Sequence, residues 1–187
     1  RLKQLLANSP NDEEILLMHG LLAYNNQHDA DARQSLDRLA LTGEHADEAR
    51  YYLALIARRQ QNPDLAETHL ESIGEGRFFI AALSELSDLL ASQDRLEEAR
   101  RNLVIARQSL PEQAAMIYVI EAEMLNKRKQ SEQAFLLLNE ALNRFPQDNT
   151  LLFARALTSD KLKKLPQFEK DMQDLIARDT GNASYLN

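Results

Sequence analysis

The fold is decided by residues 115–147, which read AMIYVIEAEMLNKRKQSEQAFLLLNEALNRFPQ. In the first half of this stretch, apolar or small residues recur three or four positions apart around Ala122, which predicts one packing face of a helix. After a polar break at 126–131, a second such face is built around Ala134 and ends at Pro146, which cannot continue a helix interior. The stretch therefore predicts two antiparallel helices joined by a short turn.

The same pattern of small residues recurs along the chain every 33 to 35 positions. Self-similarity at this period is typical of solenoids built from stacked helical hairpins. Small side chains let two helix axes approach to roughly 8 Å, so we expect these residues to lie where helices cross. The predicted repeat-packing residues are Gly20, Ala54, Ser87, Ala122 and Ala156 in the first helices, and Ala32, Ala66, Ala99 and Ala134 in the second helices, with Ala141 facing the next hairpin.

The period divides residues 1–187 into one predicted solenoid fragment. It comprises a half repeat at 1–12, full repeats at about 13–46, 47–79, 80–114, 115–148 and 149–182, and the start of a further repeat at 183–187. The last full repeat departs from the pattern, because Phe168 replaces the second small residue, Ser159 stands where earlier repeats have Leu, and Thr180 replaces the closing Pro. Two readings stay open: Phe168 fills the volume that Ser159 vacates, or the last hairpin is splayed.

These residues resemble the tetratricopeptide repeat (TPR) family over essentially the whole chain. The resemblance implies an all-α fold, a right-handed α-solenoid of antiparallel helix hairpins, the TPR superhelix. It also implies a non-enzymatic scaffold for protein–protein interaction, whose first helices line a concave groove that receives a protein or peptide partner.

Carried over to this sequence, the resemblance assigns one stripe of first-helix residues to the partner-binding face. We expect Tyr24, Tyr51 and Phe153 to act as anchors, because aromatic side chains supply large contact area at low entropic cost. The alternative is that some of these residues pack against the adjacent repeat. The predicted stripe is Leu17, Leu21, Tyr24, Tyr51, Leu55, Arg58, Asp88, Val119, Glu123, Asn126, Phe153, Leu157 and Lys161.

Composition argues against other classes of function. The formal net charge is −7 and no run of Lys or Arg exceeds a pair, so no nucleic-acid partner is expected. No apolar run approaches the ~20 residues of a membrane span, so no membrane insertion by this segment is expected. The four His never pair at ligand spacing and Cys is absent, so we predict no metal, no cofactor and no enzyme activity. Oligomeric state is not predicted.

The arginines of the middle repeats form the one uneven feature of the charge pattern. For them we expect a solvated role, or one that complements helix dipoles, rather than a site for an acidic partner. The cluster comprises Arg50, Arg58, Arg59, Arg100, Arg101 and Arg107.

A narrower resemblance concerns residues 168–179 and 182–187, which are similar to the late repeats of proteobacterial TPR lipoproteins. Those proteins are tethered to the outer membrane on its periplasmic side, and some are adaptors that hold a processing protease and its substrates, including cell-wall hydrolases. The resemblance implies a periplasmic, outer-membrane-tethered adaptor, whose lipid anchor would lie outside this segment. The alternatives are an assembly scaffold for a secretion, pilus or cytosolic complex without a protease partner, and a cytoplasmic location.

Overall fold

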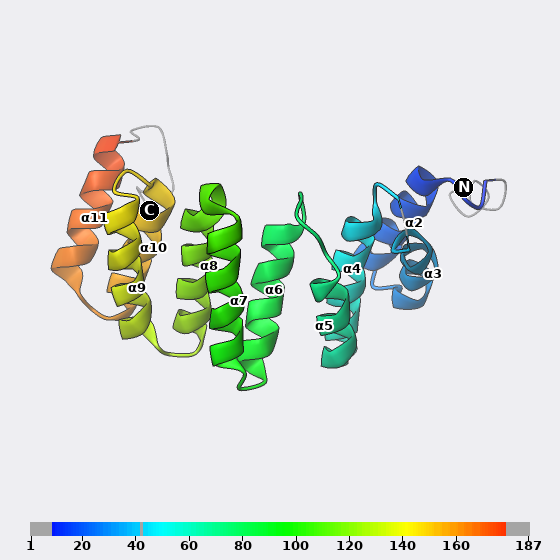
Figure 1. Cartoon of the computed structure of the whole chain (residues 1–187), viewed down its shortest axis with the longest axis horizontal. Coiled ribbons are helices and arrows are strands. Elements are labelled where there is room, and N and C mark those ends of the chain that lie inside the picture. The colour runs from blue at the N-terminus through cyan, green and yellow to red at the C-terminus, as the bar shows by residue number, and fades with distance from the viewer. Residues whose placement is uncertain (1–8, 42, 179–187) are drawn as a thin grey trace. The chain divides into compact units, whose positions relative to one another are not determined.

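The computed structural model describes residues 9–41 and 43–178, and this part of the chain is helical, without a strand (Figure 1). The predicted all-α class of antiparallel helix hairpins is confirmed, because a turn of three residues joins the two helices of each pair. The helices are α2 (Glu13–Asn25), α3 (Asp29–Leu39), α4 (Ala46–Arg59), α5 (Pro63–Glu71), α6 (Phe79–Ser92), α7 (Leu96–Ser109), the 3₁₀ helix η1 (Pro111–Gln113), α8 (Ala114–Lys127), α9 (Ser131–Arg144), α10 (Asn149–Lys161) and α11 (Leu165–Arg178).

The chain divides into two compact units, residues 1–89 (unit 1) and residues 90–187 (unit 2), and the division falls within α6. Each of the five predicted full repeats contains one pair of helices. The single solenoid over 1–187 stays a prediction. The predictions for Thr180, for the first eight residues of the half repeat 1–12 and for the repeat that starts at 183–187 lie outside the described residues.

Polar side chains fix where several helices begin. The side chains of Asp12, Asn62 and Asp148 accept hydrogen bonds of 2.9–3.2 Å from the backbone N–H three residues further on, at the start of α2, α5 and α10. Each bond satisfies one of the N–H groups that a first helical turn leaves without an intrahelical partner. Pro63 opens α5, where its fixed φ suits the helix and its missing N–H costs nothing.

Each hairpin turn holds one residue in the left-handed region of φ, although none of these residues is Gly. The residue after it donates its N–H to a carbonyl five positions earlier, at 2.8–2.9 Å, in all five turns. This bond is the one that defines a Schellman motif, and it satisfies a carbonyl at the end of each first helix. The left-handed residues, with φ between 57° and 62°, are Gln27, Gln61, Asp94, Lys129 and Lys163.

In unit 1, α4 packs against both helices of the preceding hairpin, α2 and α3. A buried cluster fills this junction and includes Leu16 of α2, Leu36 of α3 and Leu53 of α4. Gly20 shows how close α2 and α3 approach, because a Cβ added there would lie 2.8 Å from Cγ of Leu36. A larger residue at this crossing would overpack the core.

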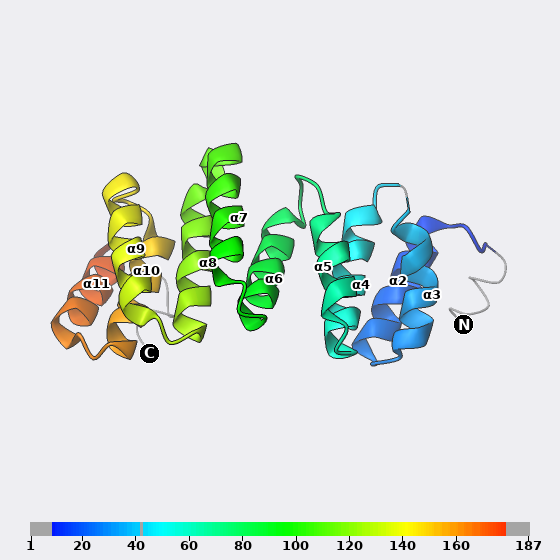
Figure 2. The same ribbon diagram turned by 60° about the horizontal axis from the view of Figure 1, so that its bottom comes forward.

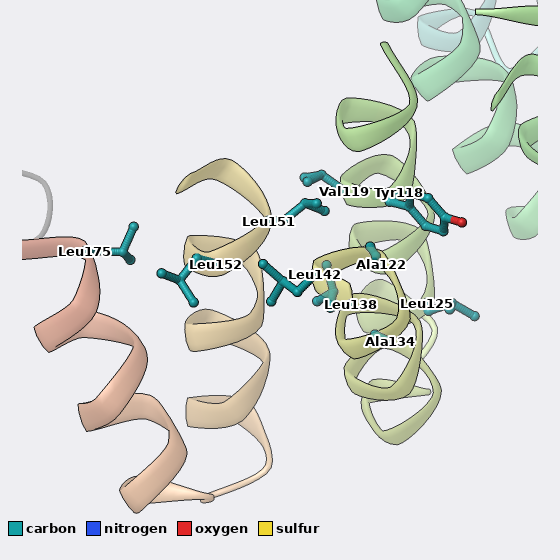
Figure 3. Packing of buried hydrophobic residues seen from close by; sticks show 11 residues of the cluster. Tyr118, Val119, Ala122, Leu125, Ala134, Leu138, Leu142, Leu151, Leu152 and Leu175 are labelled. Carbon is teal, nitrogen blue, oxygen red and sulfur yellow. The ribbon is translucent and has the colours of Figure 1, made fainter. Parts of the chain in front are cut away.

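Unit 2 repeats this arrangement, since α10 packs against both α8 and α9. Its core cluster joins four helices, with Ala122 and Ala134 on the facing sides of α8 and α9 and Leu151 and Leu152 contributed by α10 (Figure 3). Over both units, the residues singled out as repeat-packing positions are all buried, which places small side chains at the helix contacts: Gly20, Ala32, Ala54, Ala66, Ser87, Ala99, Ala122, Ala134, Ala141 and Ala156.

The last described hairpin, α10–α11, is closed rather than splayed. Leu175 of α11 is fully buried in the unit 2 core. Arg155 of α10 binds the fully buried carboxylate of Asp171 of α11 through two hydrogen bonds, Nε to Oδ2 at 2.9 Å and Nη2 to Oδ1 at 2.7 Å. Ser159 is fully buried and Phe168 is partly buried. The departures from the repeat pattern therefore leave the hairpin intact.

Candidate functional site

Four aromatic rings form a continuous row on the first-helix side of unit 1. Tyr24 of α2 meets Tyr52 of α4 edge-on, with ring centroids 5.0 Å apart, and Tyr52 lies 5.6 Å from its neighbour Tyr51. Tyr51 in turn lies 5.6 Å from Phe78, the residue that precedes α6. All four rings are partly exposed. We call Tyr24, Tyr52, Tyr51 and Phe78 the aromatic row.

Arginine side chains lie over both ends of the aromatic row. The guanidinium of Arg59 is 4.8 Å from the centroid of Tyr24, and that of Arg77 is 5.3 Å from the centroid of Phe78. Asp29 of α3 holds Arg59 in place, since Arg59 Nε donates to Asp29 Oδ2 at 3.2 Å and Nη2 contacts Oδ1. A cation over an aromatic face is attracted by the ring quadrupole, so these contacts order both partners.

Two of the middle-repeat arginines make ion pairs within unit 1. Arg58 and Arg59 lie in the last turn of α4, where a cation complements the helix dipole as expected, and each also has an anionic partner. Arg58 of α4 pairs with Glu85 of α6, and Arg59 pairs with Asp29 of α3. These pairs connect α4 with α3 and with α6 within unit 1.

Two tyrosines of the row, Tyr51 and Tyr52, have a raised pKa. Burial raises the pKa of Tyr51 above its usual 10.0, and Tyr52 and Tyr24 raise it further, against a smaller opposing effect of Arg58. Burial also raises the pKa of Tyr52, with Glu48 as the next cause. At neutral pH both hydroxyls are therefore hydrogen-bond donors as well as acceptors.

The rest of the predicted stripe in unit 1 lies at the edge of the core. Leu17, Leu21, Leu55 and Asp88 are all partly buried. Leu17, like Tyr24 and Tyr52, packs against the unit 1 core cluster. Packing against the adjacent helices therefore applies to Leu17 and Tyr24, whose side chains stay partly exposed, and their contact with a partner stays a prediction.

In unit 2 the predicted stripe is a poorer surface for a partner. Val119 is only 7% exposed and lies in the core cluster with Leu151, so its assignment as a contact residue is wrong (Figure 3). Phe153 also packs against this core and is partly buried. Asn126 of α8 is partly buried and donates from Nδ2 to Oγ1 of Thr158 on α10 at 2.8 Å.

Three residues of the predicted stripe in unit 2 are exposed, namely Glu123, Leu157 and Lys161. They belong to α8 and α10, and only Leu157 among them offers apolar surface. The aromatic pair of unit 2 is Tyr118 of α8 with Phe145, whose ring centroids lie 6.4 Å apart.

Sequence reasoning missed two members of the row, Tyr52 and Phe78. Tyr52 directly follows Tyr51, and a pattern that assigns one residue per turn to a face selects only one of the two. Phe78 follows the glycine-containing segment 72–77 and lies just before α6, so no helix-face pattern selects it. A possible signal was the concentration of aromatic residues at positions 51, 52, 78 and 79 in a chain with an aromatic content of 6%.

A second polar arrangement lies at the second-helix side of unit 2. Glu121 of α8 is only 1% exposed, and it accepts hydrogen bonds from Arg100 Nε at 2.9 Å and Arg107 Nη1 at 2.6 Å, both from α7. Arg107 lies 4.2 Å from the centroid of Tyr118, whose hydroxyl oxygen accepts a bond from Arg144 of α9 at 3.0 Å. Arg107 also lies in the last turn of α7, where a cation complements the helix dipole as expected, and Arg100 combines a partly exposed side chain with a buried anionic partner.

The described residues offer little for chemistry on a substrate. No group of three His, Asp or Glu among them could hold a metal ion. His19 is buried, with Nδ1 2.9 Å from Oγ of Ser35 across the first hairpin, so it serves packing. Among the helices of 9–41 and 43–178, none has the length and apolar character that crossing a bilayer requires.

The stacked hairpins define a protein of the TPR helical-repeat class. No family model matches the chain. The chain is 35% identical over 141 residues to the TPR repeat-containing protein PA4667 of Pseudomonas aeruginosa, an alignment that covers 75% of this chain and 24% of that protein. The repeats and this similarity support a TPR protein, and the chain spans about a quarter of the length of that relative. This class is typically a non-enzymatic scaffold for protein–protein interaction.

Proposed function

We propose that this chain is a protein-binding scaffold that holds an extended segment of a partner against the first-helix side of unit 1. The observation that supports this proposal is the aromatic row. It combines four partly exposed rings from two helices and the segment before a third. Tyrosine offers a large, rigid contact area with few torsion angles to immobilise, which is why it is enriched in binding sites.

The surroundings of the aromatic row favour binding by reducing its entropic cost. Arg59 is already held by Asp29 and by the face of Tyr24, and Arg58 is already held by Glu85. Side chains that are ordered before association lose less conformational entropy when a partner binds. Neutral hydroxyls of Tyr51 and Tyr52 add hydrogen-bond donors for the carbonyl groups of an extended peptide.

We further propose that the partner is an enzyme of the cell envelope, such as a periplasmic processing protease or a cell-wall hydrolase. The support is the resemblance of residues 168–179 and 182–187 to periplasmic adaptors. On this proposal the parent protein is periplasmic and tethered to the outer membrane. The alternative is an assembly scaffold for a secretion, pilus or cytosolic complex that has no protease partner.

A pull-down with matched variants tests the role of the aromatic row. The chain is immobilised and exposed to an envelope extract, as wild type, as Tyr51→Ala and as Leu22→Ala, which removes exposed apolar surface from α2 outside the row. We expect one envelope enzyme to be retained by the wild type and Leu22→Ala but lost with Tyr51→Ala. Circular dichroism must show equal helicity. Equal retention by all three chains would contradict the proposal.

A turnover assay separates an adaptor from an assembly scaffold. The captured protease is assayed on its substrate with and without the chain. An adaptor brings enzyme and substrate together, so we expect faster turnover at substrate concentrations below saturation. Unchanged turnover would support the assembly scaffold instead.

A further inference from the structure

Two adjoining surface cavities form a groove between the second helices α7 and α9. Their volumes are about 720 and about 590 Å³, and Val104, Arg107, Tyr118 and Glu140 line both of them. The floor is α8, which lies between α7 and α9 (Figure 2). We call this feature the α7–α9 groove. It belongs to unit 2 and shares no residue with the aromatic row.

The groove is a positively charged site on an acidic chain. Four guanidinium groups and three carboxylates line it, which gives a local charge of +1 on a chain whose formal net charge is −7. One of the three carboxylates, Glu121, is buried beneath Arg100 and Arg107 and is not available to a ligand. The charged groups are Arg100, Arg101, Arg107 and Arg144, against Glu97, Glu121 and Glu140.

The arrangement beneath the groove orders its cations. Tyr118 receives Arg107 on its ring face and accepts a hydrogen bond from Arg144 at its hydroxyl. A guanidinium group has five N–H donors, and the contacts with Tyr118 and Glu121 use only some of them. The two arginines therefore keep donors for a carboxylate in the groove, and a carboxylate accepts such donors in pairs.

Apolar side chains complete the walls. Val104 and Ile105 of α7 are 42% and 60% exposed, and Leu137 of α9 lines the same cavity. Exposed aliphatic surface beside ordered arginines suits a ligand that carries both apolar groups and carboxylates. A helical peptide with an apolar stripe flanked by acidic residues has this chemistry, and grooves between helices commonly receive such peptides.

We propose that the α7–α9 groove binds an acidic amphipathic segment of a partner protein. Its carboxylates pair with Arg101, Arg107 and Arg144, and its apolar side chains cover Val104 and Ile105. The proposal is independent of the aromatic row, because the two surfaces lie in different units and bind different chemistry. Loss of one activity leaves the other measurable.

The test uses two labelled peptides of about 15 residues, roughly four helical turns. One carries a Leu stripe flanked by Glu, and in the other Lys replaces every Glu. Fluorescence anisotropy is measured with the full chain. We expect the acidic peptide to bind and the basic peptide not to bind. The affinity for the acidic peptide should fall as the salt concentration increases, because salt screens the charge pairs. Binding of both peptides with similar affinity would overturn the proposal.

Charge-reversal variants locate the site. Arg101→Glu combined with Arg144→Glu is expected to weaken acidic-peptide binding by about tenfold or more, which corresponds to about 1.4 kcal/mol. The matched control reverses two exposed arginines of α3, Arg33→Glu with Arg38→Glu, and so changes the net charge equally. If both double variants weakened binding equally, the effect would be one of net charge, and this result would contradict the proposal that the groove is the binding site.

An apolar variant keeps the test decisive if charge reversal disturbs the fold. Ile105→Ser removes exposed aliphatic surface without altering any hydrogen bond of Glu121. We expect this variant to bind the acidic peptide with severalfold lower affinity, while its helix content stays at the wild-type level. Unchanged affinity for Ile105→Ser would exclude the apolar contact and with it the proposed occupant.

Discussion

At the scale of single residues, two carboxylates in the described part of the chain are buried, and each is bound by arginine. Glu121 is bound by Arg100 and Arg107, and Asp171 is bound by Arg155. A buried charge without a partner is strongly unfavourable, so these pairs are required once the carboxylates lie inside. In both cases the partner comes from the neighbouring helix, so each pair also fixes how two helices contact.

Replacement of Glu121 by Gln should destabilise unit 2. The change leaves the charges of Arg100 and Arg107 without their shared anion, and we expect the free energy of unfolding to fall by about 2–4 kcal/mol. Urea denaturation followed by circular dichroism measures this change. Glu123→Gln on the same helix is the control, because Glu123 is exposed and its replacement should change stability by no more than about 0.5 kcal/mol. Equal effects would refute the role of the buried pair.

His69 should make stability depend on pH. Burial lowers the pKa of His69 below its usual 6.5, Arg33 and Arg50 lower it further, and Asp37 raises it. Because the unfolded chain takes up a proton at this position before the folded chain does, stability is lost as pH falls below 6.5 towards the folded pKa.

The measurement for His69 is the free energy of unfolding between about pH 7.5 and pH 5.5, a range that brackets the ordinary His pKa. We expect a shallower pH dependence in His69→Gln than in the wild type. His28→Gln removes an exposed His and should leave the contribution of His69 in place. An unchanged slope in His69→Gln would show that His69 does not contribute.

At the scale of elements, the helices and the positions of their turns follow from the sequence, but the backbone conformation of the turns does not. The spacing of small residues around Ala122 and Ala134 indicates two packed helices, because only small side chains permit the close crossing. The turns are Schellman motifs whose left-handed residues include Lys129 and Lys163, and Gly is the residue expected there. With Gly absent, no local signal identified these positions.

Glycine at these turns should stabilise the hairpins of unit 2. A left-handed conformation costs a non-glycine residue roughly 1–2 kcal/mol, whereas Gly adopts it freely at a smaller entropic cost in the unfolded chain. Lys129→Gly and Lys163→Gly are each expected to raise the free energy of unfolding by about 0.5–1 kcal/mol. Thermal and urea denaturation measure the gain.

The control for the turn variants is Lys170→Gly, which removes an exposed Lys from within α11. Gly in a helix interior costs about 1 kcal/mol relative to good helix formers, so this variant should be less stable than the wild type. A loss of stability in Lys129→Gly and Lys163→Gly as well would mean that their left-handed geometry carries no strain.

At the scale of the whole molecule, the sequence predicted the repeats better than the surfaces. Tyr24 and Tyr51 were expected on the binding face, and they lie in the aromatic row. Val119 was expected there and is buried, because the exposure of a first-helix residue depends on how the next hairpin packs over it. The α7–α9 groove was not anticipated, since it depends on how the side chains of three consecutive helices pack together.

A destabilising change in one hairpin should act mainly within its own unit. Ala122→Leu places a large side chain at the buried α8–α9 contact and should cost about 1–3 kcal/mol by overpacking. In repeat proteins stability is carried by each repeat and its neighbours. We therefore expect amide hydrogen exchange to accelerate in residues 96–178 more than in residues 13–71. Ala30→Leu, at an exposed position of α3, is the control, and equal acceleration in both ranges would contradict this expectation.

The aromatic row has a practical consequence for spectroscopy. The chain contains no Trp and five Tyr, and three of these five belong to the row. Its near-ultraviolet absorption and intrinsic emission therefore arise largely from unit 1. Occupation of the first-helix side would change this signal without a dye or a tag, whereas a ligand confined to α7 and α9 would reach only Tyr118.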